Sequence, residues 1–156
     1  MARQDDSGNF SEDEVNYTTC VVIGALARSD DPNAAAVLQK AQRAILGFQN
    51  VEAAGYQRRD RDYGSVGYGG SQRGDLSNTH FALQALRDSG LPEDHEALQK
   101  AIVFLQRTQN LKASNDLTTK IPDPEKPDTV VEAVSGDDGG AAYYPGNSAA
   151  GYLVQP

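Results

Sequence analysis

Very few side chains in this sequence could act as nucleophiles or bind a transition metal. The chain has one cysteine, Cys20, and two histidines, His80 and His95. One thiol can form neither an intramolecular disulfide nor a metal site built from several thiolates. His95 follows Glu93 and Asp94 in the expected first turn of a helix, where we interpret it as an exposed surface residue. Cys20 and His80 are therefore the remaining candidates for this kind of chemistry.

The glycine-rich stretch Gly67-Tyr68-Gly69-Gly70 has the composition of a phosphate-binding loop. Such a loop follows a strand, however, and no strand is expected before this one. The sequence also has no serine on the tight glycine turn that a Ser-His-Asp triad uses in hydrolases. We interpret the stretch as a turn at which the backbone crosses closely between two helical hairpins.

Composition limits the partners of the chain. Its 156 residues include 14 Lys and Arg against 22 Asp and Glu, which gives a net charge of −8 and a pI near 4.6. Nucleic-acid backbones and anionic membranes repel such a chain, so we expect neither as a main partner. No apolar stretch is long enough for a transmembrane segment, and the N-terminus has no signal-peptide core. We therefore expect one soluble domain, cytoplasmic by default.

The distribution of apolar residues separates a leader from a helical region. Residues 1–14 are polar and acidic, and we expect them to form a disordered leader because they have little apolar surface to bury. Residues 15–50 carry apolar residues at helical spacing in two runs, with Asp31-Pro32 as the start signal of the second. This pattern predicts an αα-hairpin.

The hairpin pattern recurs sixty residues further along the chain. Residues 19–50 align without a gap on residues 79–110, with eleven identities in thirty-two positions. The matches fall at Thr79, Ala85, Leu86, Ser89, Pro92, Leu98, Gln99, Lys100, Ala101, Gln109 and Asn110. Average composition would give about two matches by chance. We therefore predict a second hairpin over residues 75–110 that repeats the first.

The second hairpin has clear start and stop signals. Asp75 can cap a helix that runs to about Ser89, and Gly90 can end it in a left-handed conformation. Pro92 is expected to open the next helix. An i, i+3, i+4, i+7 stripe in that helix predicts one buried apolar face, made of Leu98, Ala101, Ile102 and Leu105.

Long connections rich in glycine and proline follow both hairpins. The first, residues 51–74, contains the aromatic residues Tyr63 and Tyr68 beside its glycines. The second, residues 111–156, contains prolines and glycines that rule out a regular helix over most of its length. Its last part, Ser148–Val154, has the composition of the start of a third hairpin. The expected fold class is all-α, with two repeated αα-hairpins and long connecting loops.

The stretch from Tyr63 to Gly70, followed by Asp75-Leu76-Ser77-Asn78-Thr79 and an apolar helix, resembles the prenyltransferase and squalene-oxidase repeat. Squalene-hopene cyclases, oxidosqualene cyclases and the β-subunits of protein prenyltransferases contain this repeat. The resemblance covers about residues 16–144 and extends to bacterial proteins similar to the C-terminal domain of squalene cyclases. It implies a partial α/α toroid, a ring of helical hairpins with an inner and an outer layer.

The motifs that these enzymes use for catalysis do not occur in this sequence. Hopene cyclases protonate their substrate from an Asp-x-Asp-Asp motif. The nearest sequence here is Asp60-Arg61-Asp62-Tyr63, which we interpret as a solvated loop. Cyclases also stabilise carbocations on aromatic rings, and this chain has no tryptophan. The sequence therefore favours a non-catalytic repeat module or fragment with a binding or structural role.

The resemblance also raises the question of zinc, because protein prenyltransferases hold this ion with an Asp-x-Cys motif and a histidine. Cys20 and His80 are sixty residues apart and occupy the same position of the two repeats. Thr18 replaces the aspartate, however, the histidine is displaced by two residues and no third ligand is evident. We therefore predict no metal site and no cofactor, and interpret the pair as a buried thiol and a hydrogen-bonded helix histidine.

An alternative is that the chain is part of an isoprenoid-handling enzyme, a terpene cyclase or prenyltransferase, whose catalytic residues lie outside it. That alternative implies an apolar ligand. The candidate ligand-binding residues are Cys20, Asp75, Asn78, His80, Tyr63 and Tyr68. Two hairpins would leave open apolar faces, so we also expect either self-association or a longer parent chain that completes the ring.

Overall fold

The computed structural model describes residues 3–147, apart from residues 71, 124, 127 and 134. This part of the chain is 40% helical, with four α-helices and one two-stranded sheet. The helices are α1 (Val15–Leu26), α2 (Ala34–Gly47), α3 (Leu76–Asp88) and α4 (Glu96–Thr108). The mainly helical fold class is confirmed, and the small sheet is a feature that the all-α prediction lacked. Within the described residues, no helix is long and apolar enough to cross a membrane.

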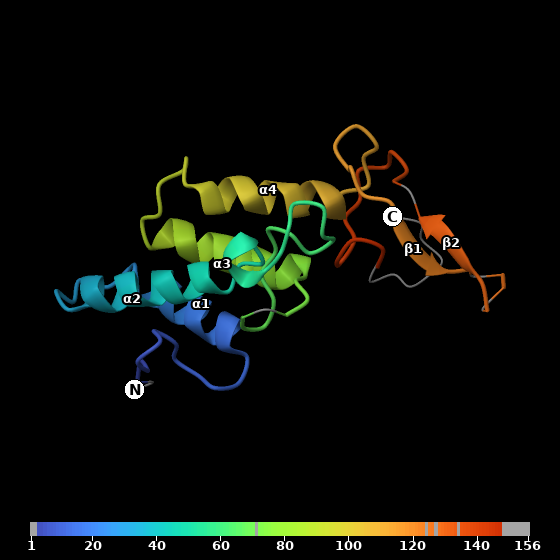
Figure 1. Ribbon diagram of the computed structural model, residues 1–156. Coiled ribbons are helices and arrows are strands. Elements are labelled where there is room, and N and C mark those ends of the chain that lie inside the picture. The colour runs from blue at the N-terminus through green and yellow to red at the C-terminus, as the bar shows by residue number, and fades with distance from the viewer. Residues whose placement is uncertain (1–2, 71, 124, 127, 134, 148–156) are drawn as a thin grey trace.

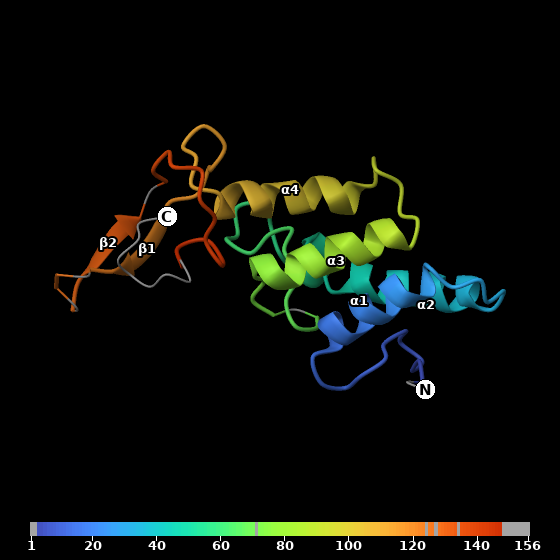
Figure 2. The ribbon, with the colours of Figure 1, turned by 180° about the vertical axis from the view of Figure 1, so that it is seen from behind.

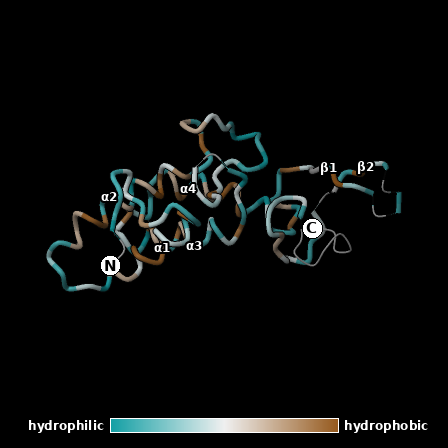
Figure 3. The backbone as a smooth tube through the Cα atoms, turned by 90° about the horizontal axis from the view of Figure 1, so that it is seen from below, coloured by the Kyte–Doolittle hydropathy of each residue, from teal (hydrophilic) through white to brown (hydrophobic). Residues whose placement is uncertain are grey.

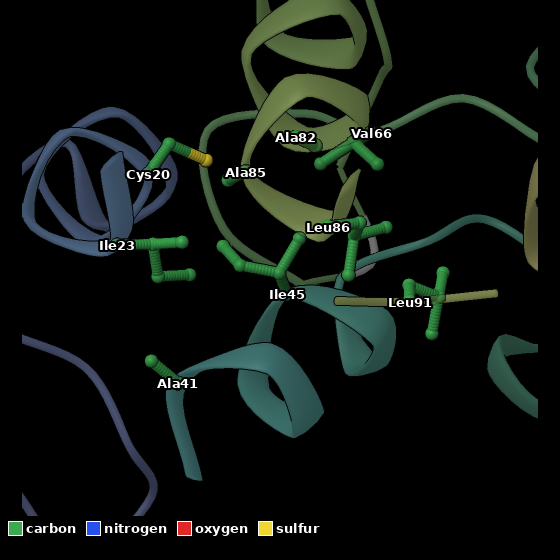
Figure 4. Close-up of a cluster of buried hydrophobic side chains, with 9 residues drawn as sticks. All are labelled: Cys20, Ile23, Ala41, Ile45, Val66, Ala82, Ala85, Leu86 and Leu91. Carbon is green, nitrogen blue, oxygen red and sulfur yellow. The ribbon is translucent and has the colours of Figure 1, made fainter. Parts of the chain in front are cut away.

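The four helices lie side by side, with α3 between α1 and α4 (Figures 1 and 2). Helix α1 packs extensively on α3, and α2 packs on both of them. In the helical part of the chain, apolar and polar residues alternate along the backbone (Figure 3), as expected when one face of a helix is buried. The apolar core lies where α1, α2 and α3 meet (Figure 4), and consists of Cys20, Ile23, Ala41, Ile45, Val66, Ala82, Ala85, Leu86 and Leu91.

The ends of α3 agree with the predicted signals, whereas the start of α4 does not. The Asp75 carboxylate accepts a hydrogen bond from the backbone N–H of Asn78, and Gly90 is left-handed with φ +85°. Helix α4 begins after His95 and not at Pro92, because the Nδ1 atom of His95 accepts the N–H of Ala97 at 3.1 Å. The prediction that His95 is merely an exposed surface residue is therefore wrong, since the ring is half-buried and caps a helix.

The described part of the leader, residues 3–14, packs against α2, which differs from the disorder expected there. The Gln4 Nε2 atom donates to the carbonyl of Val37 at 3.0 Å. Gly8 is buried in a left-handed conformation, and Phe10 packs against the core. The Gln4 bond, and one from Lys40 Nζ of α2 to the carbonyl of Asp5 at 2.6 Å, therefore help to offset the ordering entropy that apolar burial alone does not.

The second connection contains a short antiparallel hairpin where an irregular segment was predicted. Strands β1 (Thr119–Pro122) and β2 (Val130–Ala133) pair with Ile121 opposite Val131. Proline excludes a helix here but is tolerated at the end of an edge strand, and the β-branched residues favour strand pairing. The hairpin lies apart from the helices (Figure 1). The predicted start of a third hairpin, Ser148–Val154, lies outside the described residues.

Both connections close on the preceding helix in the same manner. An asparagine just after the helix donates its N–H to one carbonyl, and its own carbonyl accepts the N–H of a left-handed glycine. The bonds are Asn50 N to Ser65 O at 2.8 Å, Gly64 N to Asn50 O at 2.8 Å, Asn110 N to Gly140 O at 2.7 Å and Gly139 N to Asn110 O at 3.1 Å. The same closure therefore spans two loops of unequal length, and the longer loop contains the β1–β2 hairpin.

Each connection then contacts the start of one of the two central helices. The carbonyl of Tyr68 accepts the N–H of Asn16 at 2.9 Å, at the start of α1. The carbonyl of Tyr143 accepts the N–H of Leu76 at 2.7 Å, at the start of α3. These two bonds satisfy backbone groups that a helix start would otherwise leave without a partner.

Candidate functional site

A chain of buried polar side chains joins the first turns of α1 and α3. Both carboxylate oxygens of Asp75 accept from Asn78, one from its N–H at 2.8 Å and one from its Nδ2 at 2.9 Å. The Asn16 Nδ2 atom donates to the side-chain and main-chain oxygens of Asn78 at 3.0 and 3.1 Å. The Cys20 thiol donates to Asn16 Oδ1 at 3.3 Å. Three predicted site residues therefore meet in this network, through Asn16, which the sequence had not singled out.

The network is suited to holding two helices together and not to reacting with a substrate. Asn16, Asn78 and Asp75 are fully buried, and their side-chain polar atoms have partners. Burial also raises the pKa of the Cys20 thiol to about 12, so that the sulfur stays protonated at neutral pH. A protonated, buried thiol is neither a nucleophile nor a ready metal ligand.

We expect Cys20 to resist alkylation in the folded protein. Because the thiol is buried and its pKa is high, we expect iodoacetamide to label it at least about 100-fold more slowly than in the unfolded chain. Mass spectrometry of a labelling time course measures this ratio, with the protein in concentrated urea as the control. Equal rates in the two conditions would contradict the buried position.

Tyr68 and Tyr143 lie beside the Asp75 end of the network. Tyr68 is 40% exposed, and the centroid of its ring lies 6.0 Å from that of the Tyr17 ring. The Tyr68 hydroxyl, burial and the Asp75 carboxylate together raise the pKa of Tyr143 above its ordinary value. The predicted residues Asp75 and Tyr68 are thus neighbours, through a tyrosine of the second connection.

Tyr63 serves a different purpose from the other predicted site residues. Its ring is buried, and its hydroxyl donates to Glu52 Oε1 at 2.8 Å, at the start of the 3₁₀-helix Glu52–Ala54. Burial and this bond raise the pKa of Tyr63. The backbone N–H of Glu52 itself, Tyr63 and Lys100 lower the pKa of the Glu52 carboxyl to about 2. Tyr63 therefore holds Glu52, which in turn pairs with Lys100 Nζ of α4 at 3.0 Å, and Tyr63 is not among the residues that line the hollows between α3 and α4.

His80 lies on an apolar groove between α3 and α4. Two adjoining hollows of about 360 and 450 Å³ share His80, Leu83 and Leu105 as walls. Ile102, which the helical stripe predicted to be buried, is 43% exposed on the same groove. The prediction of a buried stripe is therefore wrong for Ile102, because no element of the described chain covers this side of α4.

The structure does not bring Cys20 and His80 into one site. The Cys20 side chain lies in the core (Figure 4) and bonds to Asn16, whereas the exposed His80 ring faces the groove. Among the described residues, no group of three or more His, Cys, Asp or Glu side chains could hold a metal ion.

Comparisons with known proteins give no match, whether with family models, with curated proteins or with solved structures. Functional proposals for this chain therefore depend on its own residues and geometry and on the motif resemblance.

Proposed function

We propose that the chain is a non-catalytic helical-repeat module of the kind that builds α/α toroids, and that its α3/α4 groove binds an apolar helix. One observation supports this proposal above others. In the first hairpin, core residues form the surface on which α3 packs. The residues sixty positions later in the second hairpin form the walls of the groove. The pairs are His80 with Cys20, Leu83 with Ile23 and Leu105 with Ile45. In the first hairpin a helix covers this surface, whereas in the second hairpin no element of the described chain covers it.

The repeated loop closures support the same proposal. In a helical-repeat protein each unit stacks on its neighbour through one recurring interface, so the contacts between units recur as well. The Asn50 and Asn110 closures and the Tyr68 and Tyr143 contacts are of this recurring type. An apolar groove at the end of such a stack is suited to bind another helix through its apolar face.

The proposal can be tested with a synthetic peptide that has the sequence of residues 15–28. We expect this labelled peptide to bind the full chain saturably in fluorescence anisotropy. We expect the variant Leu83→Asp to bind it at least about tenfold more weakly, because the peptide would bury an unpaired carboxylate in the groove. Val130→Asp provides a matched control, since Val130 is 66% exposed on the sheet and lies outside the groove. A scrambled peptide tests for non-specific binding.

The alternative function, isoprenoid handling, is favoured by the same apolar walls. Farnesol distinguishes the two proposals, because it has the isoprenoid chain but none of the helical side chains of the peptide. Saturable farnesol binding that Leu83→Asp removes, without any peptide binding, would contradict the repeat-module proposal and support the alternative. Equal peptide binding by wild type and Leu83→Asp would also contradict it.

A further inference from the structure

We propose that this chain stacks head to tail on a second copy of itself, with α1 of one copy in the α3/α4 groove of the next. We further propose that the leader, residues 3–10, blocks this stacking from within its own chain. The inference rests on the proposed function and names the partner of the groove. It is drawn from the internal contact between α1, α2 and α3, which serves as the template for the contact between copies.

Helix α1 presents nearly the same face that α3 buries. The buried residues of α3 are Asn78, Thr79, Ala82, Ala85 and Leu86, and their counterparts in α1 are Thr18, Thr19, Val22, Ala25 and Leu26. Three of the five types are identical. Ala25 is exposed, and Val22 and Leu26 are only half-buried. The partly open face of α1 that contains Val22, Ala25 and Leu26 therefore has residue types that fit a groove of this kind.

Two polar pairs between α1 and α3 can form again between two copies of the chain. Tyr17 Oη lies 2.7 Å from Ser77 Oγ, and Arg28 Nη1 lies 3.2 Å from Asp88 Oδ2. The two members of each pair are sixty residues apart, so they occupy the same position of the two hairpins. In a head-to-tail stack, Ser77 and Asp88 of one copy meet Tyr17 and Arg28 of the next, and both pairs keep their complementary chemistry.

One buried contact does not carry over. In a stack, Leu76 of one copy would take the place of Asn16, and Thr18 of the other copy would take the place of Asn78. These two side chains cannot form the hydrogen bonds that the two asparagines form. We therefore expect the contact between copies to be weaker than the internal one. Because the contact between copies is weaker, a leader docked on α2 is enough to prevent association, and its release is enough to allow it.

A buried hydroxyl in α1 lacks the partner that its counterpart has. Thr79 Oγ1 accepts the N–H of Val66 at 3.0 Å. Thr19 Oγ1 is buried as well, but among the described residues it has no hydrogen-bond partner. Val66 pairs with Gln49 in an isolated bridge, and Ala141 pairs with Gln109 in the same way. Ala141 of a stacked neighbour therefore provides the N–H that Thr19 lacks.

The leader packs on α2 in the same way as the first connection packs on α4. Gln49 Nε2 donates to Gly64 O at 2.9 Å and to Ala97 O at 2.8 Å. Gln4 Nε2 makes the equivalent bonds, to Gly8 O and to Val37 O, both at 3.0 Å, and Val37 is the counterpart of Ala97.

A second copy would bring its own glutamine to that place on α2. Gln109 is the counterpart of Gln49, and it is exposed, whereas Gln49 is buried. In a stack, Gln109 of one copy competes with Gln4 of the next for the same carbonyl of Val37. Leader docking and stacking therefore exclude one another, and releasing the leader shifts the chain towards association.

Sedimentation velocity over a concentration series tests this exclusion. The leader is released by Gly8→Ala, because Gly8 has φ +100° and a Cβ there would lie 2.6 Å from the Lys40 carbonyl oxygen. We expect wild type to stay monomeric and the weight-average mass of Gly8→Ala to rise about twofold or more. Gly55→Ala is the matched control, since Gly55 has φ +86° with nothing within 4 Å. The double variant Gly8→Ala/Leu83→Asp should be monomeric.

A mixing experiment tests the head-to-tail direction. Wild type has an open groove and a blocked leader end, whereas Gly8→Ala/Leu83→Asp has a free α1 end and no usable groove. Each should be monomeric alone, and an equimolar mixture should form a dimer that grows no further. A mixture that stays monomeric, while Gly8→Ala alone associates, would overturn the head-to-tail arrangement.

Gln4→Ala serves as a second release variant without backbone strain, in case Gly8→Ala fails to fold. Deuterium uptake in residues 3–10 reports whether the leader has left α2. A released leader with no gain in mass in either variant would overturn the inference, and so would wild type that associates as strongly as Gly8→Ala. A leader that stays protected in both variants would also overturn the inference, because the contacts of Gln4 and Gly8 would then not be what docks it on α2. Peptide binding by the groove would persist in all these cases, so the proposed function would be judged separately.

Discussion

Replacing Gly64 with alanine is expected to cost about 4 kcal/mol of unfolding free energy or to prevent folding altogether. Gly64 is buried and has φ +84°, a conformation that side chains disfavour. An added Cβ would also collide with the main-chain carbonyl of Lys100 within α4. This carbonyl is part of the helix and cannot move aside, so the first connection would have to leave α4. Urea unfolding followed by circular dichroism measures the loss.

Gly55→Ala isolates the cost of the collision from the cost of the backbone angle. Gly55 has φ +86° and no atom within 4 Å of an added Cβ, so only the left-handed strain of about 1–2 kcal/mol is expected there. A much larger loss for Gly64→Ala shows that the close approach between connection and helix holds the two hairpins together. Equal losses in the two variants would contradict the close packing.

Local signals in the sequence were sufficient to predict the helices and several of their ends. Asp75 and Gly90 act within a few residues of themselves, through a side-chain cap and a left-handed turn, so their effect does not depend on the rest of the fold. The apolar stripe of α4 was different. Periodicity shows which face of a helix is apolar, but whether another element covers Ile102 depends on the whole chain.

The docking of the leader on α2 could not be predicted from the sequence. Its contacts are few, and the separation between its glutamine and its glycine does not recur elsewhere in the chain. Gln4 and Gly8 are four residues apart, whereas Gln49 and Gly64 are fifteen apart, so no fixed offset aligns the two pairs. The contacts that hold the leader go to main-chain carbonyls, which every sequence has. Only the folded structure shows that Gln4 and Gln49 make the same kind of contact, a side-chain bond to a main-chain carbonyl of a neighbouring helix.

The buried network was predicted in part. Cys20, Asp75 and Asn78 stood out as chemically able residues near helix starts, but the link between them is Asn16, a polar residue whose position at a helix start suggests an exposed cap. Its burial follows from the packing of α1 on α3, which places two asparagines face to face. Burial also decides that these residues stabilise the fold and are not available for chemistry.

Replacing Asn78 with alanine is expected to lower the unfolding free energy by about 3 kcal/mol. The change removes one hydrogen bond to the Asp75 carboxylate, and it leaves the buried Asn16 amide with only one of its two acceptors, the main-chain carbonyl of residue 78. Buried polar groups that lose a partner cannot recover it from water, so the cost exceeds that of an exposed bond. Asn33→Ala is the matched control, because Asn33 is exposed and precedes α2 without capping it.

A double-mutant cycle with Asn16→Ala separates the bond between the helices from the effect of each residue alone. If the Asn16 to Asn78 contact couples α1 to α3, the double variant should lose about 1–2 kcal/mol less than the sum of the single losses. Urea unfolding of all four proteins gives the coupling energy. Additive losses would mean that each asparagine serves only its own helix, and the two hairpins would then be joined by apolar packing and by the Tyr17–Ser77 and Arg28–Asp88 pairs instead.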